Sequence, residues 1–428
     1  MAEKLAILGG ERAVPEGAVK KWPPIDDVDR KMVLASLEGA EHAFGPNCKA
    51  FQEEFAAWNG SRFGITTNSG TAALHMCVAA CGCGAGDEVI VPAYTWSSSA
   101  TCVLHHNAIP VFVDIDWETM NIDPDGIEAA VTEQTRAILV VHLHGLAVNM
   151  EKVLAVARRH GLKVIEDACQ AHGATFGGRK VGTFGDCAAF SFNQNKCLCS
   201  GEGGMFVTDD EAVHAAAQKL WSFGETRSPS QERDYHAYAL GWMYRNNDLT
   251  AAFARAELTK MDGYLARQKQ NAARLTECLA GVPGLILPTE PPGHGHNWYN
   301  YTLRFDMQAL GHAHDPPASG REAAFRDKIV KAMQAEGVET SLWQRFILPA
   351  MTVFQARNAY GKGCPWQCRH ARPVEYRPQD YPVAQRHADW HTGMTTPLRA
   401  PNGPDAAEAT AGGIRKVMEN LDQVEQLE

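Results

Sequence analysis

The chain has 428 residues, of which 45% are apolar and 21% are charged, and its 40 Lys and Arg against 50 Asp and Glu give a formal net charge of −10. This is the composition of an ordinary globular protein that is long enough for two domains, and the acidic balance disfavours nucleic-acid binding. The longest apolar stretch, residues 137–148, is interrupted by His142 and His144 and is shorter than the roughly 18 residues of a membrane span, which excludes a transmembrane protein. The first apolar run is too short for a secretory signal, so we expect a cytoplasmic protein.

Short β-rich segments alternate with segments of helical spacing between residues 62 and 208. The segments that we predict as strands are almost continuously apolar, as strands buried on both faces must be. They are residues 62–66, 88–91, 110–114, 137–142, 163–166, 188–192 and 205–208. This alternation predicts a mostly parallel sheet of these strands with helices between them, such as a helix over residues 150–160 that ends at Gly161.

A second part of the chain follows a long helical segment over residues 249–279. There, residues 297–305 alternate like a strand, residues 321–336 predict an amphipathic helix, and residues 361–381 lack periodicity and predict an ordered loop. We therefore expect an N-terminal arm and large α/β domain over residues 1–264, and a smaller C-terminal α+β domain over residues 265–428.

A turn containing Ser69, Gly70 and Thr71 follows the first predicted strand and opens an apolar helix. Such a turn exposes free N–H groups and the positive end of the helix dipole, which together bind phosphate. Taken alone, the same residues also fit an ordinary helix cap.

Two further residues with chemical potential follow predicted strands. Asp167 comes directly after the strand at residues 163–166, at the edge of the sheet where α/β proteins place their ligands, although an N-cap role is equally open. Lys196 lies on a loop bounded by glycines just beyond the strand at residues 188–192. Lysine is rarely buried without a task, yet most single lysines are solvated surface charges.

Together these three features match the needs of pyridoxal phosphate (PLP). The cofactor requires a lysine for a Schiff base, a carboxylate beside its pyridine nitrogen and a cradle for its phosphate. Because each feature stands at the end of a predicted strand, all three can converge on one edge of the sheet. Trp96, which follows the strand at residues 88–91, is available as an aromatic plate for the cofactor ring.

Several longer motifs extend this pattern along the chain. They are GPNCKAFQEEFA, TNSGTAALHMCVAACGCGAGDEVIVPAYTW, PVFVDIDWETMNIDP, VVHLHG, VIEDACQAHGA, GTFGDCAAFSFNQNK, GEGGMFVTDD and YRNNDLTAAFARAEL. With these motifs in this order, the chain resembles the DegT/DnrJ/EryC1/StrS family of sugar and cyclitol aminotransferases. The resemblance implies the type I fold of PLP-dependent aminotransferases, with a mostly parallel seven-stranded sheet in the large domain.

The resemblance also implies roles for individual residues. Lys196 would form the Schiff base with PLP, and Asp167 would face the pyridine nitrogen. Gln170 would bond the ring hydroxyl of the cofactor, and Trp96 would stack on its ring. The phosphate would be held by Gly70, Thr71 and Ser191, and the cofactor-binding set also includes Ser69, Asn193, Arg245 and Asn247.

Family members work as homodimers, which implies that a segment from the neighbouring subunit reaches each site. In this chain the matching residues are Arg245 and Asn247. Family dehydratases carry histidine in place of the Schiff-base lysine, so Lys196 indicates a transaminase.

The opening LAILGGERAVP is similar to the subgroup of glutamine-dependent scyllo-inosose aminotransferases and aminohydroxybenzoate synthases. Asn193 stands where many nucleotide-sugar members carry histidine. We therefore expect transfer of an amino group from glutamine or glutamate to a cyclitol ketone or keto sugar, in the biosynthesis of an aminocyclitol or amino sugar antibiotic. The alternatives are an aminohydroxybenzoate-synthase-type dehydratase and aromatase, a nucleotide-4-keto-6-deoxysugar aminotransferase and, from another class, a non-catalytic PLP-binding regulator.

Cys364, Cys368 and His370 are residue types that bind zinc. Their cysteine spacing is one residue longer than the usual CxxC, and no second cysteine pair follows. An ordinary loop is the better interpretation, and we expect no metal.

Overall fold

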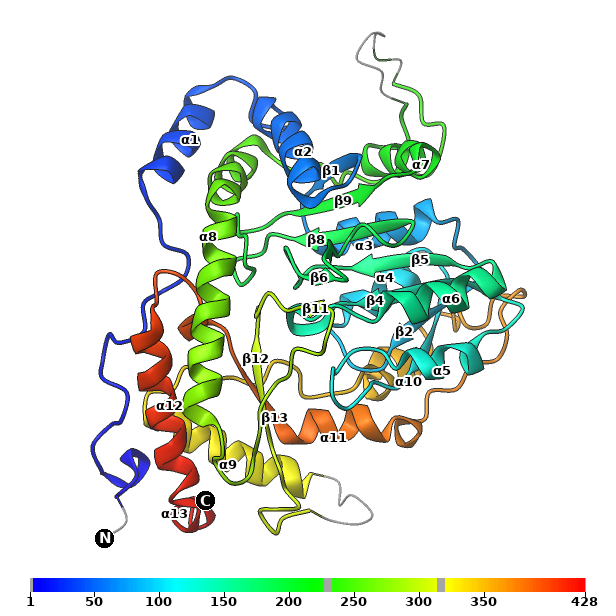
Figure 1. Cartoon of the computed structure of the whole chain (residues 1–428). Coiled ribbons are helices and arrows are strands. Elements are labelled where there is room, and N and C mark those ends of the chain that lie inside the picture. The colour runs from blue at the N-terminus through cyan, green and yellow to red at the C-terminus, as the bar shows by residue number, and fades with distance from the viewer. Residues whose placement is uncertain (1–2, 227–232, 234, 314–319, 428) are drawn as a thin grey trace.

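A central sheet forms the part of the molecule that the sequence predicts as the large domain (Figure 1). The structure is a computed structural model that describes residues 3–226, 233, 235–313 and 320–427. Within these residues seven strands pair and β9 alone is antiparallel to the others, which confirms the predicted mostly parallel sheet. In spatial order they are β1 (Phe63–Thr67), β9 (Gly204–Thr208), β8 (Cys187–Ser191), β5 (Lys163–Asp167), β4 (Thr135–Val141), β2 (Glu88–Pro92) and β3 (Ile109–Val113).

Helices cover both faces of this sheet. Successive residues of a strand point to opposite faces, and because both sets are apolar, both faces must be buried. The helices of this part are α1 (Asp27–Glu38), α2 (Pro46–Asn59), α3 (Gly70–Ala80), α4 (Ser98–His105), α5 (Pro124–Ile127), α6 (Met150–His160) and α7 (Glu211–Trp221). Val89 and Val91 share a core with α3, α4 and α7, whereas Ile90 between them shares another with α6. As predicted, α6 ends at Gly161, whose φ of 66° closes the helix.

One long helix, α8 (Asp248–Leu279), runs from α2 to a second group of elements (Figure 1). That group comprises a small antiparallel sheet of β10 (Leu285–Ile286), β12 (Tyr301–Phe305) and β13 (His391–Met394), with α9 (Arg321–Ala335), α12 (Pro404–Met418) and α13 (Leu421–Glu425). Its core also contains Leu5 and Val14 from the N-terminal arm. The domain border expected between residues 264 and 265 falls inside α8. None of the described helices, α8 included, is both long enough and apolar enough to cross a membrane.

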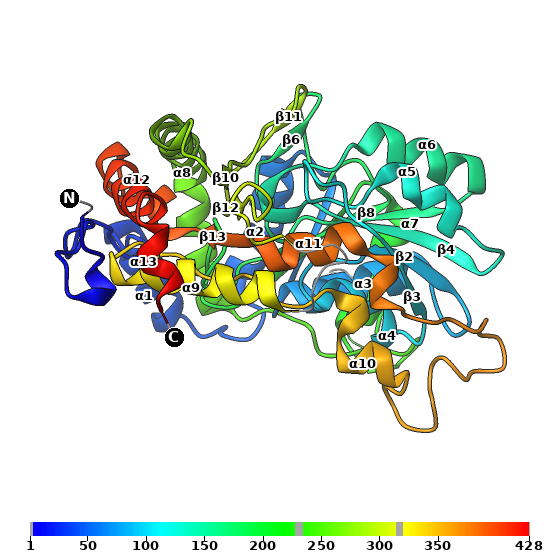
Figure 2. The same ribbon diagram turned by 90° about the horizontal axis from the view of Figure 1, so that it is seen from below.

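The loop predicted over residues 361–381 is ordered and runs past α10 (Thr352–Ala356) along the edge of the central sheet at β3 (Figure 2). Trp366 Nε1 donates to the Tyr376 hydroxyl at 2.8 Å, and that hydroxyl donates to the carbonyl oxygen of Pro110 at 2.8 Å. The other described elements are α11 (Pro382–Trp390), β6 (Thr175–Phe176), β7 (Arg179–Lys180) and β11 (His294–Gly295), and the short 3₁₀ helices η1 (Ala6–Leu8), η2 (Glu128–Ala130), η3 (Leu143–Gly145), η4 (Leu348–Ala350), η5 (Pro378–Asp380) and η6 (Thr396–Leu398).

The strand predicted over residues 297–305 is wrong in its first half, since β12 begins only at Tyr301. Trp298 has a φ of 60°, which no strand accommodates. Asn297 Oδ1 accepts the backbone N–H of Tyr299 at 2.8 Å, and Gln268 of α8 donates to the carbonyl oxygens of Asn297 and Trp298. Side-chain amides therefore satisfy this segment in place of a strand partner.

Candidate active site

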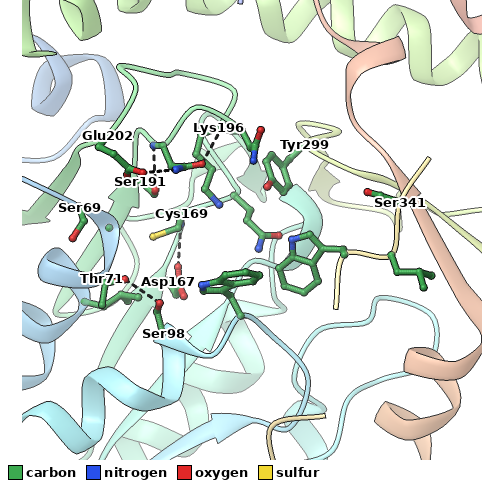
Figure 3. Close-up of a pocket in the computed structure, with 18 residues that line it drawn as sticks. Ser69, Thr71, Ser98, Asp167, Cys169, Ser191, Lys196, Glu202, Tyr299 and Ser341 are labelled. Atoms are coloured by element: carbon green, nitrogen blue, oxygen red, sulfur yellow. Dashed lines mark hydrogen bonds between the residues drawn. The ribbon is translucent and has the colours of Figure 1, made fainter. Parts of the chain in front are cut away.

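A cavity of about 490 Å³ lies where β5 and β8 end beside the first turn of α3 (Figure 3). Three residues from the C-terminal half of the chain close its far side: Ser341, Leu342 and Trp343. Among the described residues, all members of the predicted cofactor-binding set except two line this cavity. The lining members are Ser69, Gly70, Thr71, Trp96, Asp167, Gln170, Ser191, Asn193 and Lys196, and the two that do not are Arg245 and Asn247.

The first turn of α3 has the form of a phosphate cradle. Ser69 caps the helix, because its Oγ accepts the backbone N–H of Ala72 at 3.1 Å. Gly70 and Thr71 are the first residues of the helix, so their N–H groups have no carbonyl partner within it. A Cβ atom on Gly70 would lie 2.7 Å from the Cβ of Ser191, so only glycine lets the helix approach β8 this closely. Exposed amides beside a serine hydroxyl fit the phosphate of PLP.

Asp167 is held in one orientation at the end of β5. Its side chain is nearly buried, with 5% of its surface exposed. Oδ2 accepts the Ser99 hydroxyl at 2.7 Å, and Oδ1 accepts the backbone N–H of Cys169 at 3.1 Å. These two donors are neutral, so the carboxylate has no ion-pair partner among the described residues. A buried carboxylate that lines the cavity fits a cationic ring nitrogen.

Lys196 lies on the loop after β8, where its backbone N–H donates to the carbonyl oxygen of Asn193 at 2.8 Å. Its Nζ atom is 4.9 Å from the centroid of the Tyr299 ring. Burial by itself lowers the pKa of the Lys196 ammonium, but Tyr299, Cys169 and Asp167 raise that pKa by more, so it lies above its ordinary value. In the chain alone Lys196 is therefore a cation, and it must lose a proton before it can act as a nucleophile.

Aromatic side chains form the walls of the cavity. The indole of Trp96 has 53% of its surface exposed, and its ring centroid is 6.2 Å from that of Trp343. Trp343 packs edge-on against His144, whose backbone N–H donates to Oε1 of Gln170 at 2.8 Å. Because this bond occupies Oε1, the amide nitrogen of Gln170 is the group that can donate to a ligand.

Arg245 and Asn247 lie beside the cavity, at the other end of the turn that precedes α3. The backbone N–H of Asn68 donates to the carbonyl oxygen of Tyr244 at 2.8 Å, which brings the two segments together. Asn247 caps α8 by accepting the N–H of Thr250 at 3.0 Å. The guanidinium of Arg245 is 5.3 Å from the centroid of the Phe223 ring.

Several lining residues were not singled out from the sequence. Cys169 falls within the DACQ motif and Ser98 follows the PAYTW motif by two residues, so closer attention to those motifs could have found them. Trp343 had no such signal, because it comes from the far half of the chain. The other lining residues that sequence reasoning missed are Leu74, Asn195, Glu202, Ser341 and Leu342. Tyr299 also lines the cavity, and it belongs to the aromatic run at residues 298–301 that the family resemblance places at the substrate pocket.

The described residues contain no group of three or more His, Cys, Asp or Glu side chains placed to bind a metal ion. Cys364, Cys368 and His370 belong to the loop that packs along the central sheet.

The sequence of the chain matches a family of known proteins. Residues 23–371 match the DegT/DnrJ/EryC1/StrS aminotransferase family. The chain belongs to this family. The predicted transaminase is thereby confirmed.

Relatives within the DegT/DnrJ/EryC1/StrS family match most of the chain. The L-glutamine:scyllo-inosose aminotransferase of Streptomyces griseus is 37% identical, and the match covers 99% of this chain and 100% of that protein. The GDP-perosamine synthase of Caulobacter vibrioides is 37% identical over 74% of this chain and 82% of that protein. The crystal structure of 3-amino-5-hydroxybenzoic acid synthase superposes with a TM-score of 0.82 at 26% identity, covering 94% of this chain and 99% of that one.

Proposed function

We propose that this enzyme uses PLP to transfer an amino group from glutamine or glutamate to a polyhydroxylated ketone, a cyclitol such as scyllo-inosose. The observation that carries the proposal is the convergence of Lys196, Asp167 and the first turn of α3 on one cavity. The match to the Streptomyces griseus enzyme over nearly the whole of both chains supports the choice of donor and acceptor. The setting would be the cytoplasmic biosynthesis of an aminocyclitol or amino sugar natural product.

The lining residues that would act on PLP have distinct tasks in this proposal. The N–H groups of Gly70 and Thr71 and the Ser191 hydroxyl hold the phosphate, and Asp167 stabilises positive charge on the ring nitrogen. The Gln170 amide donates to the ring hydroxyl, while Trp96 covers one face of the ring. When bound, PLP supplies the electron sink that makes a proton on the donor's α-carbon acidic. Lys196 would remove that proton and return it at the former aldehyde carbon of the cofactor, across the shared nitrogen, and it would perform the reverse transfers when the acceptor ketone is bound.

The charges in the cavity favour an uncharged acceptor. Lys196 is the only cationic side chain among the described residues that line it, whereas Asp167 and Glu202 contribute carboxylates. A nucleotide-sugar diphosphate needs cationic partners, and the described lining offers none beyond the lysine that reacts. A neutral polyol requires no such partner.

A homodimer that shares its sites across the interface is part of the proposal. Large apolar side chains are exposed between residues 223 and 243, close to the turn before α3, and they include Phe223, Leu240 and Met243. Apolar exposure of this kind marks protein contacts. A partner placed on these residues would bring its own Arg245 and Asn247 towards the cavity. Light scattering of wild type and Leu240→Glu tests this, because a monomeric wild type would contradict the dimer.

The experiment that tests the proposed function follows the cofactor and then the product. Wild type and Lys196→Ala are incubated with PLP, reduced with borohydride and digested, and the Lys196 peptide is examined by mass spectrometry. We expect PLP on Lys196 in the wild type only, and an aminated product when glutamine and scyllo-inosose are added. A dehydrated or aromatic product would favour the aminohydroxybenzoate-synthase alternative, and PLP binding without turnover would favour a regulator.

A further inference from the structure

Four side chains form a stack in which aromatic rings alternate with cations, and the stack ends at Lys196. The guanidinium of Arg399 is 5.2 Å from the centroid of the Trp22 ring on one side and 5.4 Å from that of Tyr299 on the other. Lys196 Nζ follows at 4.9 Å from the Tyr299 ring. The four residues come from the N-terminal arm, the turn after η6, the segment before β12 and the loop after β8. Segments far apart in sequence thus meet behind the lysine.

Arg399 is an unusual residue in this stack because it is a buried cation, with 2% of its surface exposed. Its Nη2 atom donates to the backbone carbonyl oxygen of Asn195 at 2.6 Å, while its Nε atom has no hydrogen-bond partner within the described residues. Within the described part of the chain it forms no salt bridge. Burial of a cation without a carboxylate is unfavourable, and two ring faces and one carbonyl compensate for it only in part.

The contacts of Arg399 fix the surroundings of Lys196 from two sides. Asn195, whose carbonyl it binds, directly precedes Lys196 in the chain, and Tyr299 is the ring on which the Lys196 ammonium rests. We propose that Arg399 is a positioning residue for Lys196, an inference that rests on the proposed function. By holding both neighbours, it sets the approach of the Lys196 nitrogen to the aldehyde carbon of PLP.

The platform that carries Arg399 is itself firmly held. Asn271 of α8 donates to the carbonyl oxygens of Leu398 and Asn402, at 2.9 Å each. The Asn402 side chain in turn accepts the backbone N–H of Lys20 in the N-terminal arm at 2.6 Å. A reactive group on a loop keeps its geometry only when such surroundings restrict it.

The step that this positioning serves is the covalent capture of PLP. The deprotonated Lys196 amine attacks the aldehyde carbon, a C=N bond replaces the C=O bond, and the oxygen leaves as water. Capture can be followed on the protein without amino donor or ketone. PLP is added to the cofactor-free enzyme, samples are reduced with borohydride at intervals, and the modified Lys196 peptide is quantified by mass spectrometry.

The variants are Arg399→Met and Arg399→Lys, and the matched control is Arg326→Met. Arg326 is an equally buried arginine that donates to the carbonyl oxygens of Ala388 and His391, and it does not line the cavity. Both methionine variants should lower the melting temperature. Arg399→Met should slow capture by about tenfold or more, whereas Arg326→Met should stay within about twofold of wild type. Arg399→Lys keeps the charge and should recover part of the rate.

Equal capture rates in folded Arg399→Met and Arg326→Met would overturn the positioning role while leaving the proposed function intact. If Arg399→Met does not fold, Arg399→Lys decides instead, and a wild-type rate in that variant also overturns the role. Failure of the wild type to capture PLP at Lys196 would contradict the proposed function itself.

Discussion

Ser99, in the first turn of α4, donates a hydrogen bond of 2.7 Å to Oδ2 of Asp167 at the end of β5. Ser99 also lies 3.1 Å from the hydroxyl of Thr95, so a short chain of hydroxyls leads to the carboxylate. This bond joins the start of α4 to the end of β5 and fixes the Asp167 carboxylate that lines the cavity.

Ser99→Ala should weaken PLP binding and lower kcat by about tenfold, because a hydrogen bond to a charged group contributes about 1.5–3 kcal/mol. Ser97→Ala in the same serine run is the control, since Ser97 makes no capping bond to α4. Equilibrium titration with PLP and steady-state turnover measure both effects. Identical behaviour of the two variants would show that Asp167 does not depend on Ser99.

Gly70→Ala should reduce affinity for PLP much more than affinity for pyridoxal, which lacks the phosphate. The new methyl group would meet Ser191 at 2.7 Å and push the first turn of α3 away from β8. We expect PLP affinity to fall by about tenfold or more. Gly84→Ala, where an added Cβ has open space, is the control. Equal losses for the two ligands would contradict a phosphate cradle at α3.

Capture of PLP by the cofactor-free enzyme should accelerate as the pH rises. Burial lowers the pKa of Lys196, but Tyr299, Cys169 and Asp167 raise that pKa by more. The reactive neutral amine is therefore the minor form of Lys196 at neutral pH. Tyr299→Phe retains the ring but removes the phenol, and its rate profile should move to lower pH. Stopped-flow absorbance across a pH series provides the measurement, and a flat profile from pH 7 to about 9 would refute the raised pKa.

Glu257 of α8 should make the protein less stable as the pH rises from about 4.5 to about 7. Burial raises the pKa of its carboxyl to about 7 from an ordinary value of 4.5, although Lys260 opposes the shift. The folded state therefore binds the proton more tightly than the unfolded chain does, and stability falls as pH rises between these two values.

Glu257→Gln mimics the protonated acid and should remove this dependence. The melting temperature of wild type should decline relative to that of Glu257→Gln between pH 5 and pH 8, while Glu53→Gln, at an exposed position of α2, should follow wild type. Parallel curves for wild type and Glu257→Gln would argue against a raised pKa.

Much of the fold follows from local pattern, and the rest depends on distant contacts. The strands of the central sheet are buried on both faces, so apolar runs such as residues 137–141 identify them directly. Asp167 and Lys196 follow such strands, and the sequence alone therefore predicts that both lie at one edge of the sheet. The roles assigned to them, like the domain border near residue 264, stay predictions.

Trp343 and Arg399 had no comparable signal in the sequence. Trp343 lines the cavity, and Arg399 contacts Asn195, only because the C-terminal part of the chain packs against residues far before it in the sequence. The false strand at residues 297–300 arose in the same way, because its backbone partners are the amide of Asn297 and Gln268 of a distant helix. Alternation along a sequence cannot anticipate such partners.

The strand order also dictates when the first turn of α3 can be anchored during synthesis. β1 leads directly into the first turn of α3, yet its sole neighbour in the described sheet is β9, with Phe63 paired to Thr208. The turn is therefore anchored only after the ribosome has delivered β9 and the two strands have met across a long intervening stretch. Such non-local pairing is slow to form. A nascent chain that ends before Thr208 would contain Ser69, Gly70 and Thr71, but without the β1–β9 pairing their turn would not be held in place.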